Sequence, residues 1–583
     1  MGELGALLVA WTRQNRWWLR LGLGLVVLLV LLTVAGLLLY DYWDGRASLT
    51  SNAPMRKISH TDLNPFGANL FLHREVEPWK IEKTLDMVAE AGIAWVKVHV
   101  PWEEIEPTRK GVYLDPTTQA DTWAKYDRIL TACEERGLQV VARLDRPPDW
   151  AREDSSYKER PPDNLEDYGD FCSAFCERFQ GRIYAIQVWN EPNIFPEWGN
   201  RAVDPEGYVA LLRVAYARIK EADPNVLVLS APLAITLGQP HPEPGQWISM
   251  SDLDFLEGMY RAGAADFFDI LGANAFGMDR PPEDPPSEDV LNFSRLLLQR
   301  EIMERYGDGD KAVWVNEFGW NAAPATMPSE KLVWRRVDEA QQAEYSVRAI
   351  DMARDEWPWC GVIMVWYFRQ VGNITPDQAD YYFRMVDPDF TPRPLYWAIQ
   401  EAATSQPPPG PGVYQETHAS VERRGDWATV VDRQALGDSL FVSEQAGDSL
   451  TLRFMGTGVD LYIRRATDGG RLQVKVDGAS VAGLSQDAAG ASYLELDRSP
   501  ARSRQRLQLV DGLHAGQHTV ELIVVPRDDG IVGPCAVDGF AVLGLQDSRF
   551  PWTYLGLVLA ALGLDIWFLV RTWGRLRWLI RGR

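Results

Sequence analysis

Cysteine and histidine are scarce in this chain of 583 residues. The five cysteines are odd in number and no two of them have metal-ligand spacing, while the seven histidines form no HExxH motif or comparable close pair. We therefore expect neither a structural metal nor a cofactor. Cys172 and Cys176 lie one turn apart in the helical pattern FCSAFCERF, which favours small core residues over a disulfide.

Positive charge is also in short supply, because the formal net charge is -22. A protein that binds nucleic acid needs a basic face, so this balance argues against nucleic acid as a partner. Hydrophobic residues make up 46% of the chain, which is typical of globular domains and not of disorder. The length allows several domains, and we find no internal repeat.

Two long hydrophobic runs lie near the ends, at 19–40 and 551–570. Each has roughly the 20 residues that a membrane-spanning helix needs. The first run is too long for an ordinary signal-peptide core and no A-x-A site follows it, so a permanent anchor is favoured over a cleaved signal peptide. The alternative for the second run is a buried core helix, and Asp565 within it is costly in a bilayer.

The charges beside these runs predict their orientation. Cytoplasmic flanks of membrane helices are enriched in arginine and lysine. Arginines precede the first run or lie at its edge, and others follow the second run; their positions are 13, 16, 20, 571, 575, 577, 581 and 583. We therefore expect a cytoplasmic N-terminus (1–18), a basic cytoplasmic tail (571–583) and a large region between the spans on the outer side of the plasma membrane.

Between 64 and 404, short apolar runs alternate with longer helical patterns. This alternation over eight strands predicts an α/β fold, a (β/α)8 TIM barrel. A doubly wound sheet is the structural alternative, but no glycine-rich phosphate turn follows any strand. The strand candidates are 66–73, 93–100, 138–145, 183–190, 225–232, 270–277, 311–318 and 361–368.

Two linkers and a second domain complete the organisation. Residues 41–63 form the first linker, and the second, 405–413, contains the run SQPPPGPG. From 414 to 546, alternating apolar and polar residues separated by Gly and Asp turns predict an antiparallel β-sandwich. The stretches FMGTGVDLYIRRATDGGRLQVKVDG and GLHAGQHTVELIVV resemble the galactose-binding-like jelly-roll modules that accompany many glycosidases. The module either binds glycan or serves as a spacer.

Polar side chains collect where the predicted barrel strands end. Glu191 follows the fourth strand in VWNEPN, and Glu317 ends the seventh in VWVNEFGW. The C-terminal ends of barrel strands meet in one mouth, so the two carboxylates should face each other there. Glycoside hydrolysis needs such a pair, one a protonated acid and the other an anion. Burial and mutual repulsion separate the pKa values of the two groups.

Both motifs resemble the acid/base and nucleophile motifs of the clan A glycoside hydrolases, especially families 39 and 5. PWEEIEPTRKGVY and VDPDFTPRPLYWAI support the resemblance, which covers about residues 64–403. It implies that Glu191 is the acid/base and Glu317 the nucleophile of a retaining enzyme, about 5 to 5.5 Å apart. Near strand six, ANAFG places Asn274 and Phe276 where family members usually carry a histidine and an aromatic hydroxyl.

Four further residues are candidates for substrate binding. Asn190 either hydrogen-bonds a sugar 2-hydroxyl or caps a loop, and Trp366 either stacks on a sugar or packs in the core. Asn274 lies near the end of strand six. Arg143 ends strand three, where it either neutralises neighbouring carboxylates or touches substrate.

The sequence thus predicts a membrane-anchored retaining glycosidase that acts on an extracellular or cell-surface polysaccharide by double displacement. Its expected partners are the polysaccharide or oligosaccharide substrate and the lipid bilayer. A non-catalytic glycan-binding or scaffold protein of polysaccharide export is one alternative. A transglycosidase, which would use the same residues, is another.

Overall fold

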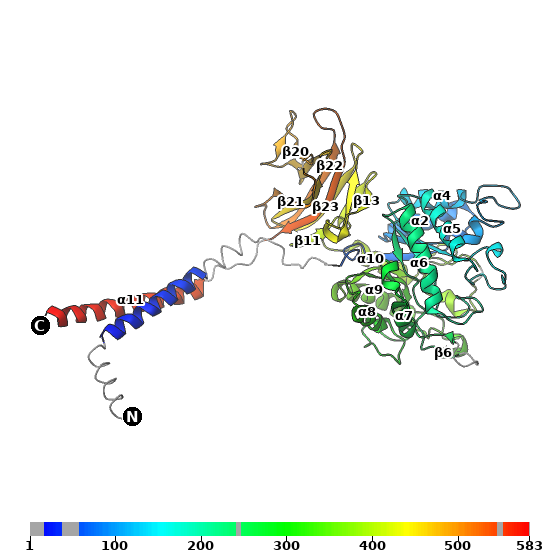
Figure 1. The fold of residues 1–583 in the computed structure, drawn as a ribbon, viewed down its shortest axis with the longest axis horizontal. Helices are drawn as coiled ribbons and strands as arrows, with labels where there is room; N and C mark the ends of the chain where they lie inside the picture. Colours follow the sequence, from blue (N-terminus) through cyan, green and yellow to red (C-terminus); the bar gives the residue numbers. More distant parts are fainter. Residues whose placement is uncertain are drawn as a thin grey trace, which may run out of the picture.

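The structure is a computed structural model that describes residues 17–37, 58–240, 247–372, 374–498, 500–544 and 552–581. Figure 1 shows a barrel surrounded by helices, a β-sandwich beside it and two long helices near the chain ends. This is the fold class that the sequence predicts, and it is confirmed.

Eight parallel strands form the barrel, in the order β5-β4-β3-β2-β1-β10-β9-β8. A parallel bridge between Leu229 and Ile270 joins the two outer strands and closes the sheet. Almost every residue of these strands is buried, because side chains fill the interior and helices cover the outside. The strands are β1 (Phe66–Leu70), β2 (Trp95–Pro101), β3 (Gln139–Asp145), β4 (Ala185–Val188), β5 (Leu227–Leu229), β8 (Leu271–Phe276), β9 (Val313–Gly319) and β10 (Cys360–Val365).

The helices around the barrel begin at residues that satisfy their first backbone N–H groups. Asn164, Asp204 and Ser251 cap α5, α6 and α7, and Asp338 forms a capping box with Gln341 at the start of α9. The covering helices are α2 (Pro78–Glu90), α4 (Ala124–Glu134), α5 (Leu165–Arg178), α6 (Pro205–Ala222), α7 (Asp252–Arg261), α8 (Leu296–Arg305), α9 (Glu339–Glu356) and α10 (Pro394–Thr404).

Short elements shape the barrel mouth. The 3-10 helix η1 (Leu72–Arg74) follows β1, and the one-turn helix α3 (Trp102–Ile105) follows β2. A small hairpin of β6 (Gln239–Pro240) and β7 (Trp247–Ser249) follows β5, and Ser249 bridges to Ile194 in the loop after β4. This hairpin forms part of the cleft wall and was not predicted from the sequence.

The second domain is an antiparallel sandwich of two sheets. One sheet has the order β13-β14-β23-β16-β21 with β11 paired to β23, and the other β12-β15-β22-β17-β20-β19 with β18 paired to β17. Alternate residues of β22, among them Val520, Leu522 and Val524, point into the shared core. The strands are β11 (Gly412–Gln415), β12 (Val421–Arg424), β13 (Ala428–Val431), β14 (Ser439–Ser443), β15 (Ser449–Gly456), β16 (Gly458–Arg465), β17 (Arg471–Val476), β18 (Ala479–Ser480), β19 (Ser485–Gln486), β20 (Ser492–Glu495), β21 (Arg502–Val510), β22 (Gly516–Val525) and β23 (Cys535–Leu543).

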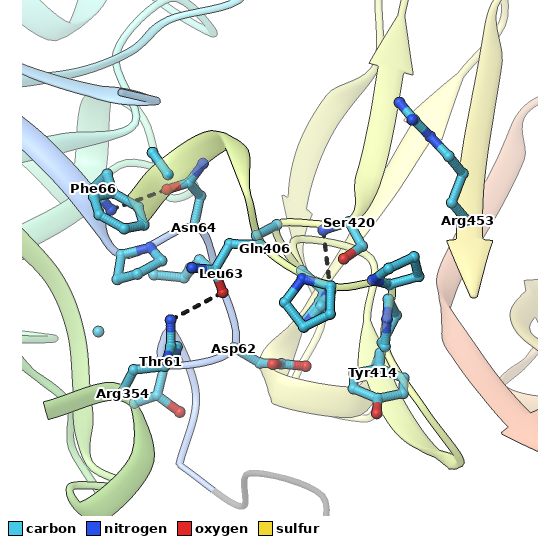
Figure 2. A pocket seen from close by; sticks show the side chains of 18 of the residues that line it. Thr61, Asp62, Leu63, Asn64, Phe66, Arg354, Gln406, Tyr414, Ser420 and Arg453 are labelled. Carbon is cyan, nitrogen blue, oxygen red and sulfur yellow. Dashed lines mark hydrogen bonds between the residues drawn. The ribbon is translucent and has the colours of Figure 1, made fainter. Parts of the chain in front are cut away.

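The sandwich docks on the foot of the barrel, where the strands begin. Asp62, just before β1, accepts a hydrogen bond from the backbone N–H of Gln415 at 2.8 Å, and its carbonyl accepts one from the Thr417 hydroxyl at 3.0 Å. A cavity of about 830 Å³ lies at this junction. Figure 2 shows Asp62 and Leu63 on the barrel side of it, facing Tyr414 and Ser420 of the sandwich.

The two terminal helices are long and apolar enough to cross a membrane. The first spans Trp17–Leu37, and the second, α11, spans Trp552–Arg581. They contact each other at Gly24, where an added Cβ would lie 2.6 Å from the Leu569 side chain, so glycine allows their close approach. The helix α11 includes most of the basic tail and therefore extends beyond the predicted membrane span of 551–570. Residues 38–40 and 551 lie outside the described residues.

Candidate active site

A cleft of about 600 Å³ at the C-terminal ends of the barrel strands contains both predicted glutamates. Glu317 belongs to β9 and is only 5% exposed, while Glu191 lies three residues beyond the end of β4. The residues Asn190, Arg143, Asn274 and Trp366, which the sequence offered as substrate contacts, all lie in or against this cleft.

The loop that carries Glu191 has an unusual backbone. Trp189 and Glu191 have φ angles of 72° and 40°, in the left-handed region that side chains other than glycine rarely adopt. The buried Trp189 indole holds the loop in this form by donating to the carbonyl of Glu197 at 2.9 Å, and the N–H of Glu191 donates to the carbonyl of Pro232 at 3.0 Å. The Asn-Glu-Pro motif therefore projects its carboxylate from a fixed backbone.

Glu317 has a buried cation as its direct partner. The Lys97 ammonium on β2 donates to Glu317 Oε1 at 2.9 Å, and the two side chains are 4% and 6% exposed. Burial lowers the pKa of Lys97, and the Glu317 charge opposes that effect. This charge-assisted hydrogen bond holds the Glu317 side chain against β2.

Glu191 lies in the opposite environment. Burial, followed by the charges of Glu317 and Glu197, raises its pKa to about 8. Asn274 Nδ2 on β8 donates to Glu191 Oε1 at 2.7 Å and favours the anion, but this effect is smaller. Glu191 is therefore mainly protonated at neutral pH, which is the state required of a general acid.

Amide side chains fix the two glutamate-bearing segments relative to each other. Gln187 Nε2 donates to the carbonyl of Trp189 at 2.7 Å and to Asn190 Oδ1 at 3.2 Å. Asn316 Nδ2 donates to Gln187 Oε1 at 2.7 Å, and Asn69 Nδ2 donates to the carbonyl of Asn316 at 2.9 Å. Because all these groups are buried, the network constrains β1, β4 and β9 together.

Arg143 belongs to a buried charge network beside the two glutamates. Its Nε donates to Asp145 Oδ2 at 2.5 Å, and its Nη2 lies 3.8 Å from Glu197 Oε2. Asp145 also hydrogen-bonds His99, whose pKa burial lowers to about 4, so that this histidine is neutral at neutral pH. Arg143 thus contacts carboxylates of the protein itself, which fits a role in neutralising neighbouring carboxylates.

Trp366, just after β10, forms part of an aromatic wall. It is partly exposed to the cleft and packs edge-on against Phe71, with ring centroids 5.6 Å apart. Phe276 and Trp334 lie on the same side of the cleft and pack against each other at 6.3 Å. Sequence reasoning did not identify Trp334, which lies in an irregular segment between β9 and α9.

The site also contains a third carboxylate that sequence reasoning missed. Glu197 lines the cleft, and burial raises its pKa to about 7 although Arg143 opposes the effect. It lies only six residues after Glu191, so a systematic examination of acidic residues in the strand-end loops would have found it. Among the described residues, no group of three or more His, Cys, Asp or Glu side chains is arranged to hold a metal ion.

Similar folds occur among solved glycoside hydrolases. A family 39 enzyme from Bacteroides cellulosilyticus WH2 is 18% identical, with 81% of this chain and 82% of that chain covered and a TM-score of 0.44. A family 39 β-xylosidase from Caulobacter crescentus is 16% identical over 81% and 97% of the two chains, with a TM-score of 0.43. A family 5 protein from Streptomyces cattleya is 16% identical over 59% and 82%, with a TM-score of 0.42.

No protein-family model and no curated protein sequence matches this chain. The fold and site define a (β/α)8 barrel with two carboxylates in unlike environments within one cleft.

Proposed function

We propose that this protein is a retaining glycoside hydrolase that acts on a polysaccharide by double displacement. The observation that carries the proposal is the contrast between the two carboxylates. Glu317 is paired with a buried ammonium, whereas Glu191 has a neutral amide donor and a pKa of about 8. An acid and an anion within one cleft are the two groups that this reaction needs.

In the first step, a Glu317 oxygen attacks the anomeric carbon and the bond to the leaving oxygen breaks. Glu191 gives its proton to that oxygen, and a covalent glycosyl-enzyme forms. In the second step, Glu191, now a carboxylate, takes a proton from water as the water oxygen attacks the same carbon. Glu317 is released, and the configuration of the product is that of the substrate. Asn190, which precedes Glu191 and lines the cleft, would contact the sugar.

The assignment is tested with the full chain in detergent micelles and aryl glycosides of differing leaving group. Glu191→Ala should lose most activity on poor leaving groups but still form the intermediate from good ones, and azide should then give a glycosyl azide of retained configuration. Glu317→Ala should lose turnover on every substrate, and azide should give the inverted product. Reversed azide stereochemistry would overturn the assignment, and unchanged activity in both variants would overturn the catalytic function.

We further propose that the two terminal helices anchor the protein in the plasma membrane, with both ends cytoplasmic and the barrel outside. The arginines that flank the apolar runs support this orientation. The substrate would then be an extracellular or cell-surface polysaccharide. Protease added to intact cells should cleave between the two helices and leave the basic tail protected, whereas a tail accessible from outside would contradict this topology.

A further inference from the structure

The walls of the cleft differ in chemical character. The segments that end β1, β2 and β3 contribute four cations, which are Arg74, Lys97, Arg143 and Arg146. The segments that follow β8, β9 and β10 contribute mainly apolar and aromatic groups, which are Phe276, Met278, Leu291, Trp334 and Trp366. Four cations in one cleft are notable because the chain as a whole has a net charge of -22.

Two of these cations form close ion pairs with carboxylates of the protein. Lys97 pairs with Glu317 at 2.9 Å, and Arg143 pairs with Asp145 at 2.5 Å. They are needed to balance buried carboxylates of the site, so they do not require a ligand to explain them.

The other two cations are incompletely paired. Arg146 Nη2 contacts Glu159 Oε1 at 3.0 Å, but its buried Nε has no hydrogen-bond partner. Arg74 has no carboxylate within ion-pair distance in the part of the chain that the structure describes. Its guanidinium lies 5.2 Å from the centre of the Phe71 ring, which supports it at the edge of the cleft.

The guanidinium of Arg74 also lies in an unfavourable electrostatic environment. Burial lowers its pKa, and the charges of Arg146 and Arg143 lower it further, while Glu104 opposes the effect. Arg74 is exposed to solvent at the edge of the cleft, so water and salt screen part of this repulsion, and an anion bound beside the arginines would reduce it further. A guanidinium can donate two parallel hydrogen bonds to a carboxylate or a sulfate, which makes arginine well suited to such an anion.

We propose that the substrate is an anionic polysaccharide whose carboxylate or sulfate ester binds to Arg74 and Arg146. The sugar ring would lie along the aromatic wall, with its charged substituent toward the β1–β3 wall. This inference rests on the proposed glycosidase function and specifies the class of its substrate. It assigns Arg74 a role in specificity and none in bond cleavage.

The test uses oligosaccharides that share a backbone and differ in charge. For a β-1,4-linked glucose backbone the three probes are cello-oligosaccharides, their 6-O-sulfated form and β-1,4-oligoglucuronate. β-1,4-manno-oligosaccharides, their sulfated form and β-1,4-oligomannuronate provide a second set. Binding is measured by calorimetry on the full chain in detergent micelles. The chain carries Glu191→Gln, which prevents consumption of the probes and keeps the Lys97–Glu317 ion pair intact. Hydrolysis of the same probes is followed with the unmodified chain.

We expect at least one anionic probe to bind about tenfold or more tightly than its neutral counterpart at low salt, and this preference should shrink as ionic strength rises. Arg74→Gln should remove most of the preference, and Arg74→Lys should retain part of it. The matched control is Arg128→Gln, which removes an exposed arginine from α4 outside the cleft and should leave the preference intact. Comparison of the sulfated and carboxylated probes identifies which anion is preferred.

Equal binding of neutral and anionic probes would overturn the proposal, as would failure to bind any anionic probe. An equal loss of preference in the Arg128 control would also overturn it. The outcome is separable from that of the proposed function. Hydrolysis of neutral probes without a charge preference would refute the anionic substrate and support the glycosidase function. Charge-selective binding without hydrolysis of any probe would support the anionic ligand and contradict the glycosidase function.

Discussion

Asn274 gives the most direct test of how the structure sets the protonation of Glu191. Its Nδ2 donates to Glu191 Oε1 at 2.7 Å, and this hydrogen bond favours the anionic form of the carboxyl group. The pKa of Glu191 is nevertheless about 8, because burial and the charges of Glu317 and Glu197 outweigh the amide. Asn274→Ala removes the amide and leaves the groups that raise the pKa in place.

The expected size of the effect follows from the strength of this bond. A hydrogen bond to a charged group contributes about 1.5 to 3 kcal/mol, and about 1.36 kcal/mol corresponds to one pKa unit. The pKa of Glu191 should therefore rise by about one unit or more in the variant. The protonated form is the active one, so activity is complete below this pKa and is lost as pH rises through it. The alkaline limb should move from about pH 8 upward.

The assay is the pH dependence of kcat/KM, which reports the pKa values of the free enzyme. An aryl glycoside with a poor leaving group requires the proton and should show the alkaline limb. A dinitrophenyl glycoside does not require it, so its glycosylation step should lack that limb in both proteins. An alkaline limb that stays in place or moves to lower pH in Asn274→Ala would refute the reasoning.

Substitutions at three further residues test the surroundings of the two glutamates. Glu197→Gln removes a negative neighbour that raises the pKa of Glu191. The alkaline limb of the kcat/KM profile should therefore move below pH 8, in the direction opposite to that of Asn274→Ala, and an upward shift would contradict this prediction. Lys97→Met leaves Glu317 buried without its cation and should lower kcat/KM about 100-fold or more, whereas Lys97→Arg should keep part of the activity. Steady-state kinetics measures the loss of activity, and a thermal melt shows whether the variant is still folded. Trp366→Ala should raise KM up to about tenfold with little change in kcat if the indole stacks on sugar, and an unchanged KM would argue for packing alone.

The sequence predicted the barrel well because its strands are continuous apolar runs. Functional residues of such barrels collect at the C-terminal ends of the strands, and the polar residues at those ends include Glu191 and Glu317. The partners of those residues could not be predicted in the same way. Asn274 and Lys97 are far from the glutamates in sequence, and periodicity carries no information about which polar groups meet across a barrel mouth. The β6–β7 hairpin is also too short to give a pattern.

Arg74 was missed for a related reason. It lies in the short 3-10 helix that follows β1, one residue beyond the predicted strand 66–73. Its significance depends on the lack of a carboxylate at ion-pair distance among the described residues and on the nearby charges of Arg146 and Arg143, and both are properties of the folded chain. The docking of the sandwich through Asp62 likewise joins segments more than three hundred residues apart.

The attachment of the sandwich to the foot of the barrel has a consequence for reach. Both terminal helices join the folded domains on this side, through residue 58 before β1 and residue 544 after β23. The glutamates lie at the other end of strands such as β2, whose seven residues span about 23 Å. In the proposed membrane-anchored state, the cleft would therefore open on the side of the barrel that is opposite the two attachment points. If the protein acts as the proposed membrane-anchored glycosidase, its cleft would reach sugar chains that extend outward from the surface more readily than the units nearest to it.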